Sequence, residues 1–161
     1  MTAIYIDADA CPVRDEVYRV AERLNLEVFV VSNGSRPIRP SPNPQVHMVV
    51  VDAGADAADH WIADHIGPGD ICVTGDIPLA SRSLAKDASA LAPNGKIWTK
   101  DNIGNALAGR EVSRHLRELG ATGGGAAPFS KADRSRFLQA LDKLVHAAKA
   151  LTNSKTTPLP P

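Results

Sequence analysis

The stretch AIYIDADACP, residues 3–12, contains the pattern that decides the fold. Its isoleucines alternate within a short apolar run that closes at Asp7, so residues 3–8 are predicted to form a buried strand. Pro12 suits the first turn of a helix, and valines and leucines at helical spacing carry that helix to about Leu24. A buried strand followed closely by a helix predicts the first half of a strand–helix–strand unit.

The same alternation continues along the chain. Further strands are predicted at residues 27–32, 46–51 and 70–74, and further helices at 56–66 and 77–88. Residues 34–45 contain four prolines, which exclude regular structure there. Short connections between alternating strands and helices predict a three-layer α/β fold, with a mainly parallel sheet flanked by helices on both faces.

The C-terminal part is predicted to be helical. One helix is expected at residues 101–119, followed by a glycine-rich loop at 120–127. A second helix starts at a capping-box-like Ser130 and runs to about Ala150. Its expected buried stripe consists of Phe137, Leu141, Leu144, Val145 and Ala148. We therefore expect a single domain over residues 1–151 and a disordered tail over 152–161.

The composition is that of an ordinary globular domain. The chain has 161 residues, of which 43% are hydrophobic and 22% are charged. It contains no apolar run of the ~20 residues that a membrane span needs, and its N-terminus lacks the features of a signal peptide. Cys11 and Cys72 form no CxxC motif. These features predict a cytoplasmic protein that does not enter a membrane.

The charges are distributed unevenly along the chain. Residues 1–76 contain twelve Asp/Glu and five Arg, a net charge of −7, whereas residues 77–161 contain six acids and thirteen Lys/Arg, a net charge of +7. An acidic half that could hold cations is thus joined to a basic half that could contact phosphates. The alternative is that the two kinds of charge mix over the folded surface.

Aspartates gather where the predicted strands end. Asp7, Asp9, Asp52 and Asp76 stand at or just after a strand, and the carboxyl ends of parallel strands form the ligand-binding edge of such sheets. Asp56 and Asp59 share one helix face. Clustered carboxylates without a Cys/His set favour Mg²⁺ or Mn²⁺. The predicted metal ligands are Asp7, Asp9, Asp56, Asp59 and Asp76, with Asp7 and Asp76 as the catalytic residues.

Each aspartate also has a structural alternative. Asp56, Asp76 and Asp101 occupy positions where a helix N-cap is expected, and a cap alone would explain any one of them. Caps do not explain several acids at strand ends together. Cys11 is interpreted as a buried structural thiol and Cys72 as part of the core.

Arginines supply candidate contacts for a nucleic-acid backbone. Arg110, Arg114 and Arg117 form a stripe along one predicted helix, and Arg36 and Arg39 lie in the proline-rich loop. A solvated helix face and an ordinary loop are the alternatives. The expected partner is nucleic acid, with RNA favoured.

Four ordered motifs resemble the YaiI/YqxD family of bacterial proteins. They are DADACP at residues 7–12, GADAAD at 54–59, TGDIPLA at 74–80 and FSKADR at 129–134. The family has been placed among PIN-like domains, whose characterised members are metal-dependent ribonucleases. This resemblance implies that Asp7, Asp76, and Asp56 or Asp59 match the acids of the PIN site. The usual fourth acid has no clear counterpart, although Asp101 is the best candidate, and this gap leaves a non-cleaving site open.

Two other interpretations stay open. Residues 4–9 also resemble the first motif of haloacid-dehalogenase phosphatases, with Asp7 as nucleophile and Asp9 as general acid. That family needs a lysine between its second and last motifs, and residues 35–74 contain none. The third interpretation is a non-catalytic module that binds RNA or a partner. The favoured hypothesis is a nuclease that hydrolyses phosphodiester bonds with Mg²⁺ or Mn²⁺.

Overall fold

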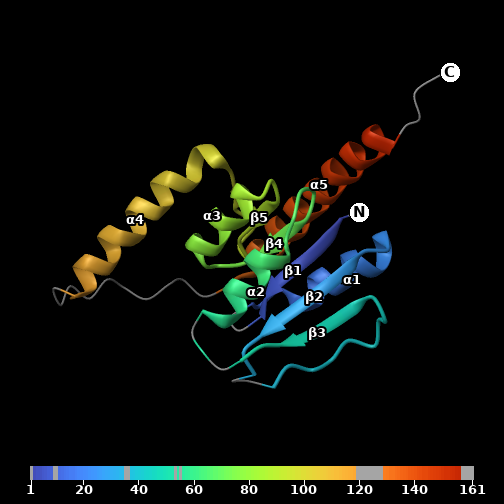
Figure 1. The fold of residues 1–161 in the computed structure, drawn as a ribbon, viewed down its shortest axis with the longest axis horizontal. Helices are drawn as coiled ribbons and strands as arrows, with labels where there is room; N and C mark the ends of the chain where they lie inside the picture. The colour runs from blue at the N-terminus through green and yellow to red at the C-terminus, as the bar shows by residue number, and fades with distance from the viewer. Residues whose placement is uncertain are drawn as a thin grey trace.

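The chain folds into a six-stranded sheet with helices on both faces (Figure 1). The structure, a computed structural model, describes residues 2–8, 11–34, 37–52, 54, 56–118 and 129–156, of which 110–118 and 151–156 are described by their backbone alone. The strands are β1 (Ala3–Asp7), β2 (Glu27–Ser32), β3 (Val46–Val50), β4 (Ile71–Val73), β5 (Ser89–Leu91) and β6 (Ile97–Trp98). The helices are α1 (Arg14–Leu24), α2 (Ala57–His65), α3 (Ile77–Ala85), α4 (Lys100–Glu118) and α5 (Lys131–Thr156).

The sheet is mainly parallel, as the sequence predicts. Its strand order is β3-β2-β1-β4-β5-β6, and each neighbouring pair from β3 to β5 is parallel. Only β6 runs antiparallel, paired with β5. Strands β5 and β6 were not predicted, because strands of three and two residues are too short to show a hydrophobic period.

Two apolar layers sandwich the sheet. On one face, Ile4 and Ile6 pack in the cluster that α1 and α5 close, with Phe137 and Leu141 of α5 fully buried. On the other face, Tyr5 packs with α2. Farther along the sheet, α3 and the start of α4 cover β5 and β6. The alternation of side chains along β1 therefore supplies both layers.

The strand order creates a switch point between β1 and β4. From β1 the chain moves outward through β2 to β3 and then returns to the opposite side of β1, where it forms β4 and β5. In open parallel sheets, ligands bind beyond the carboxyl ends of the strands at this point. Asp7 ends β1, and the segment 74–76 follows β4. The fold therefore brings these residues to the same edge, as predicted.

The C-terminal helices differ slightly from their predicted bounds. Thr99 and Asn102 form a reciprocal cap, in which the Asn102 N–H donates to Thr99 Oγ1 at 3.2 Å and the Thr99 N–H donates to Asn102 Oδ1 at 2.8 Å, and α4 accordingly begins at Lys100. Helix α5 continues through Thr156, beyond the residue at which the sequence analysis ended it. Within the described part of the chain, no helix combines the length and the apolar character needed to cross a membrane.

Candidate active site at the carboxyl edge of the sheet

A threonine hydroxyl joins the ends of β1 and β4. Ile6 is paired with Val73 in the sheet, so Asp7 and Thr74 follow as neighbours. The Thr74 hydroxyl donates to Asp7 Oδ2 at 3.0 Å and accepts the N–H of Asp76 at 2.9 Å. Because Thr74 is only 1% exposed, this pair of hydrogen bonds is shielded from water and fixes Asp7 relative to the turn that carries Asp76.

Asp76 is the N-cap of α3. Its Oδ1 accepts the N–H of Leu79 at 3.2 Å, and Pro78 follows in the first turn. The helix-cap interpretation of Asp76 is therefore confirmed. The same carboxylate is also hydrogen-bonded to Asp59 of α2, so capping does not exclude a place in the site.

Asp59 completes the convergence. The pKa of Asp59 is raised to about 7, chiefly by burial and then, in decreasing order, by the negative charges of Asp7 and Asp76, the hydrogen bond to Asp76 and the charge of Asp56. Below this pH, the protonated Asp59 carboxyl donates to the Asp76 carboxylate. We call the group Asp7, Asp56, Asp59 and Asp76 the acidic edge.

The sequence-predicted ligands divide into three groups. Asp7, Asp59 and Asp76 are brought together. Asp56 is the N-cap residue of α2 but makes no side-chain cap hydrogen bond, and its exposed carboxylate acts on Asp59 through its charge. Asp9 lies outside the described residues.

The remaining candidates lie elsewhere or are not described. Asp101 is exposed in the first turn of α4 and is not among the charges that act on Asp59. Arg39 is exposed in the loop before β3. Arg36 lies outside the described residues, as do the side chains of the α4 arginines, namely Arg110, Arg114 and Arg117.

Sequence reasoning gave no role to two residues that organise this edge. One is Thr74, which opens the motif TGDIPLA two residues before Asp76 and whose hydroxyl accepts the Asp76 N–H. The other is Asn33 at the end of β2, whose side-chain amide donates to the carbonyl of Gly54 at 3.5 Å. That contact ties the end of β2 to the segment that leads into α2, the helix of Asp59.

The two cysteines are structural, as predicted. Cys11 is buried, and burial raises the pKa of its thiol to about 11. Cys72 lies in β4 with no exposed surface, and burial raises the pKa of its thiol to about 12. Thiols with such high pKa values are almost wholly protonated near neutral pH and are poor nucleophiles.

The acidic edge fits a hard cation in its chemistry. Its donors are carboxylate oxygens, and the pKa of Asp59 is raised first by burial and then by the negative charges of the neighbouring aspartates. Among the described residues, however, no three His, Cys, Asp or Glu side chains are placed so that they could hold one metal ion. The metal ligands predicted from the sequence therefore stay a prediction.

A surface hollow flanks this edge on the side of β3. It has a volume of about 390 Å³ and is lined by the end of β3, Asp52, Ala57, Trp61 and Asp64. A second hollow of about 470 Å³ lies between α1 and residues 41–44 and contains none of the acidic-edge carboxylates.

Comparison with known proteins identifies the relatives of this chain. Residues 5–147 match the model of the "Uncharacterized BCR, YaiI/YqxD family". A UPF0178 protein of Paramagnetospirillum magneticum is 57% identical over 92% of this chain and 97% of its own length. UPF0178 proteins of Caulobacter vibrioides and Rhodospirillum rubrum are 54% and 55% identical, over 92% and 91% of this chain and 96% and 97% of their own lengths. No solved structure matches. With a family model that spans most of its length and relatives this similar, the chain belongs to the uncharacterised YaiI/YqxD family.

Proposed function

We propose that this protein is a metal-dependent nuclease that hydrolyses phosphodiester bonds, with RNA as its substrate. The observation that carries the proposal is the convergence of Asp7, Asp59 and Asp76 at the switch point of the sheet. Three separate elements deliver carboxylates to one place, which helix capping alone does not require.

The proposed ligands of Mg²⁺ or Mn²⁺ are the acids predicted from the sequence. They are Asp7, Asp9, Asp56, Asp59 and Asp76, of which Asp7 and Asp76 are the proposed catalytic residues. Such a cation lowers the pKa of bound water and offsets charge on a phosphodiester. The resemblance to PIN-like domains points to the same chemistry.

The chain's own groups have distinct roles in this proposal. Thr74 holds the Asp7 carboxylate in one orientation, and the Leu79 N–H does the same for Asp76. The pKa of Asp59 is about 7 without a cation, chiefly because of burial, so binding of a cation by Asp59 would release its proton and would weaken as the pH falls below about 7. The arginines predicted from the sequence, namely Arg36, Arg39, Arg110, Arg114 and Arg117, are proposed to contact the backbone of the bound strand.

The test is cleavage of a labelled single-stranded RNA with Mn²⁺. Wild type should cleave, stop when a chelator is added and resume with excess Mn²⁺. Asp76→Asn should abolish cleavage while keeping the fold, because asparagine is an equally good N-cap for α3. Asp64→Asn, an exposed aspartate on α2, is the matched control and should cleave like wild type.

The other outcomes separate the alternatives. Equal cleavage by wild type and Asp76→Asn would identify a contaminating nuclease and refute the proposal. Hydrolysis of a small phosphomonoester that depends on Asp7, without RNA cleavage, would favour the phosphatase. RNA binding that ignores the chelator, without cleavage of any substrate, would favour the binding module.

A further inference from the structure

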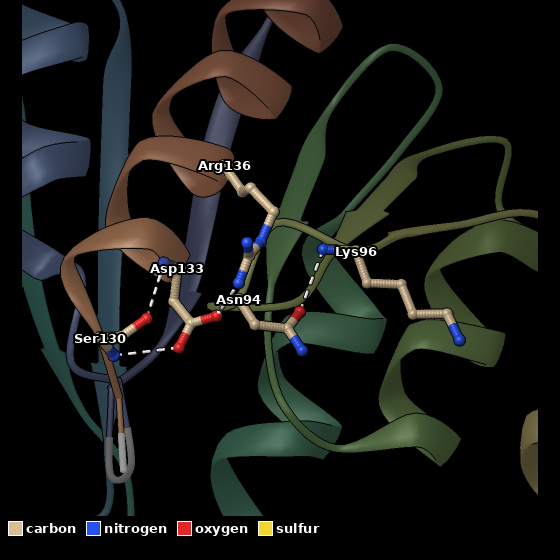
Figure 2. A network of polar contacts seen from close by, with 5 residues as sticks. All are labelled: Asn94, Lys96, Ser130, Asp133 and Arg136. Atoms are coloured by element: carbon tan, nitrogen blue, oxygen red, sulfur yellow. Dashed lines mark hydrogen bonds and ion pairs between the residues drawn. The ribbon is translucent and has the colours of Figure 1, made fainter. Parts of the chain in front are cut away.

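The start of α5 is fixed by a reciprocal cap (Figure 2). The Ser130 N–H donates to Asp133 Oδ2 at 2.9 Å, and the Asp133 N–H donates to Ser130 Oγ at 3.1 Å. The Arg136 guanidinium, one turn later, is paired with the same Asp133 carboxylate. Because the cap settles where the helix begins, the side chains of its first two turns have defined positions.

Two contacts place this start of α5 against the carboxyl edge of the sheet. On one side, Arg134 Nη1 donates to Glu16 Oε1 at 2.7 Å and to the carbonyl of Pro12 at 3.4 Å. On the other side, Gly95 lies so close that a Cβ there would be 2.7 Å from backbone and side-chain carbons of Arg136. Helix α5 therefore begins between the turn that precedes α1 and the turn that joins β5 to β6.

The β5–β6 turn shares its edge with the acidic residues. Leu91 is paired with Val73 in the sheet, and the Thr74 N–H donates to the Leu91 carbonyl at 3.0 Å. Val73 in turn is paired with Ile6, the residue before Asp7. Neighbouring strands lie about 4.8 Å apart, so the turn begins roughly 10 Å from the end of β1.

Exposed cations occupy this part of the edge. Lys96 lies over the Trp98 ring at 4.5 Å, and Arg134 lies over the Phe129 ring at 5.0 Å. We call Lys96, Lys131, Arg134 and Arg136 the cationic rim; all four are exposed. Only Glu16 and Asp133 are paired with them among the described ion pairs, so the rim carries a net charge of +2 (four cations less two carboxylates).

We infer that the cationic rim binds the phosphodiester backbone of a single-stranded nucleic acid. The phosphate next to those bound by the rim lies over the acidic edge. This inference rests on the proposed function for the identity of the ligand. The ring contacts of Lys96 and Arg134 restrict these two side chains, which reduces the entropy lost when they bind a phosphate. The rim supplies the attraction that a polyanion needs next to a cluster of carboxylates.

The test measures binding apart from cleavage. Fluorescence anisotropy of a labelled single-stranded RNA in excess chelator would compare wild type with the triple variant Lys96→Gln, Lys131→Gln, Arg136→Gln. Arg134 stays unchanged because it is paired with the buried Glu16. The matched control removes three exposed cations away from this edge, as Arg19→Gln, Lys86→Gln, Lys143→Gln. The same strand as DNA tests whether the contacts are to phosphates rather than to the ribose 2′-hydroxyl.

The expected result is a weaker and less salt-dependent complex for the rim variant alone. Each phosphate contact contributes about 0.7 to the slope of log affinity against log salt, so three contacts contribute about 2. Between about 50 and about 200 mM salt, wild type should therefore lose about twentyfold more affinity than the rim variant. The variant Lys96→Arg, Lys131→Arg, Arg136→Lys keeps all three charges and should bind like wild type. If the three side chains acted only by supporting the structure, this variant should lose affinity as the glutamine variant does.

Failure of this inference differs from failure of the proposed function. If the rim variant binds like wild type, or if the rim and control variants lose affinity equally, the rim is overturned even where Asp76-dependent cleavage is observed. Absence of binding by wild type to both RNA and DNA also overturns it. Rim-dependent binding without cleavage supports the rim and argues against the nuclease.

Discussion

Replacing Asp59 by asparagine should change the stability of the protein only at pH values at which the wild-type Asp59 carboxyl is ionised. Asparagine has nearly the same shape and can donate to the Asp76 carboxylate in place of the protonated Asp59 carboxyl. It cannot become charged among Asp7, Asp56 and Asp76. The substitution therefore removes a charge conflict and leaves the packing in place.

The size of the effect follows from the pKa of Asp59. The gap between a pKa of about 7 in the folded protein and about 3.9 in an unfolded chain corresponds to roughly 4 kcal/mol. Asp59 is only half-buried, so water screens part of this energy. We expect about 1–2 kcal/mol, which for a domain of this size is a shift in Tm of roughly 2–8 °C.

The pH dependence has a defined sign. The pKa of Asp59 is raised on folding, so the folded protein holds its proton more tightly than the unfolded chain does. This contribution to stability is fully present below about pH 4 and is lost as the pH rises through about 7. Wild type should therefore lose about 1–2 kcal/mol over this range, relative to Asp59→Asn.

Urea unfolding of both proteins at about pH 4 and about pH 8 tests this reasoning. The difference in unfolding free energy between variant and wild type should grow by about 1–2 kcal/mol in favour of the variant at the higher pH. Asp64→Asn makes the same chemical change on the same helix at an exposed position, and its difference from wild type should stay constant. A difference for Asp59→Asn that is equal at both pH values would refute the crowding of charge at the acidic edge.

Two further substitutions test the geometry of this edge. Gly95→Ala should cost about 1–3 kcal/mol of unfolding free energy, because its φ of +93° is strained for alanine and the new Cβ meets Arg136. Gly69→Ala is the control and should cost less, because Gly69 has a similar φ of +83° but open space around its Cβ position. Equal losses in urea unfolding would mean that the contact between residue 95 and Arg136 contributes nothing. Thr74→Val should cost about 1–2 kcal/mol of unfolding free energy, because the half-buried Asp7 carboxylate and the Asp76 N–H both lose their hydrogen bond to the Thr74 hydroxyl. Thr74→Ser should keep most of the stability, and a valine variant as stable as wild type would contradict these hydrogen bonds.

The parallel sheet and its aspartate-bearing edge were predictable because the signals are local. A short apolar run followed by a helical period identifies β1 and α1 without reference to the rest of the chain. Asp7 and Asp76 then fall at strand ends, and parallel strands bring their carboxyl ends to one edge whatever the strand order. The stripe on α5 was also visible, and Phe137, Leu141, Val145 and Ala148 are buried as predicted.

The remaining features depend on packing between distant segments. Strands β5 and β6 are held by their neighbours in the sheet and by α3 and α4, and their five residues show no period of their own. The hydrogen bond from Asp59 to Asp76 requires that α2 and α3 lie side by side, which no spacing in the sequence encodes. The sequence also does not show which elements the apolar stripe of α5 packs against. In the structure the stripe packs in the cluster with β1 and α1, and the ion pair between Arg134 and Glu16 joins α5 to α1.

This packing brings basic residues from the second half of the chain next to acidic residues from the first half, at the carboxyl edge of the sheet. Helix α5 belongs to the basic half of the sequence, but its contacts with Pro12, Glu16 and Gly95 return its first turns to the edge formed by the acidic half. The two groups of charge do not neutralise each other at Asp59, because the charges that act on its carboxyl are all negative. In the two proposals made above, the acidic edge binds a cation and the cationic rim binds a polyanion. A phosphodiester strand and a divalent cation satisfy both at once, whereas either ligand alone leaves one set of charges unopposed.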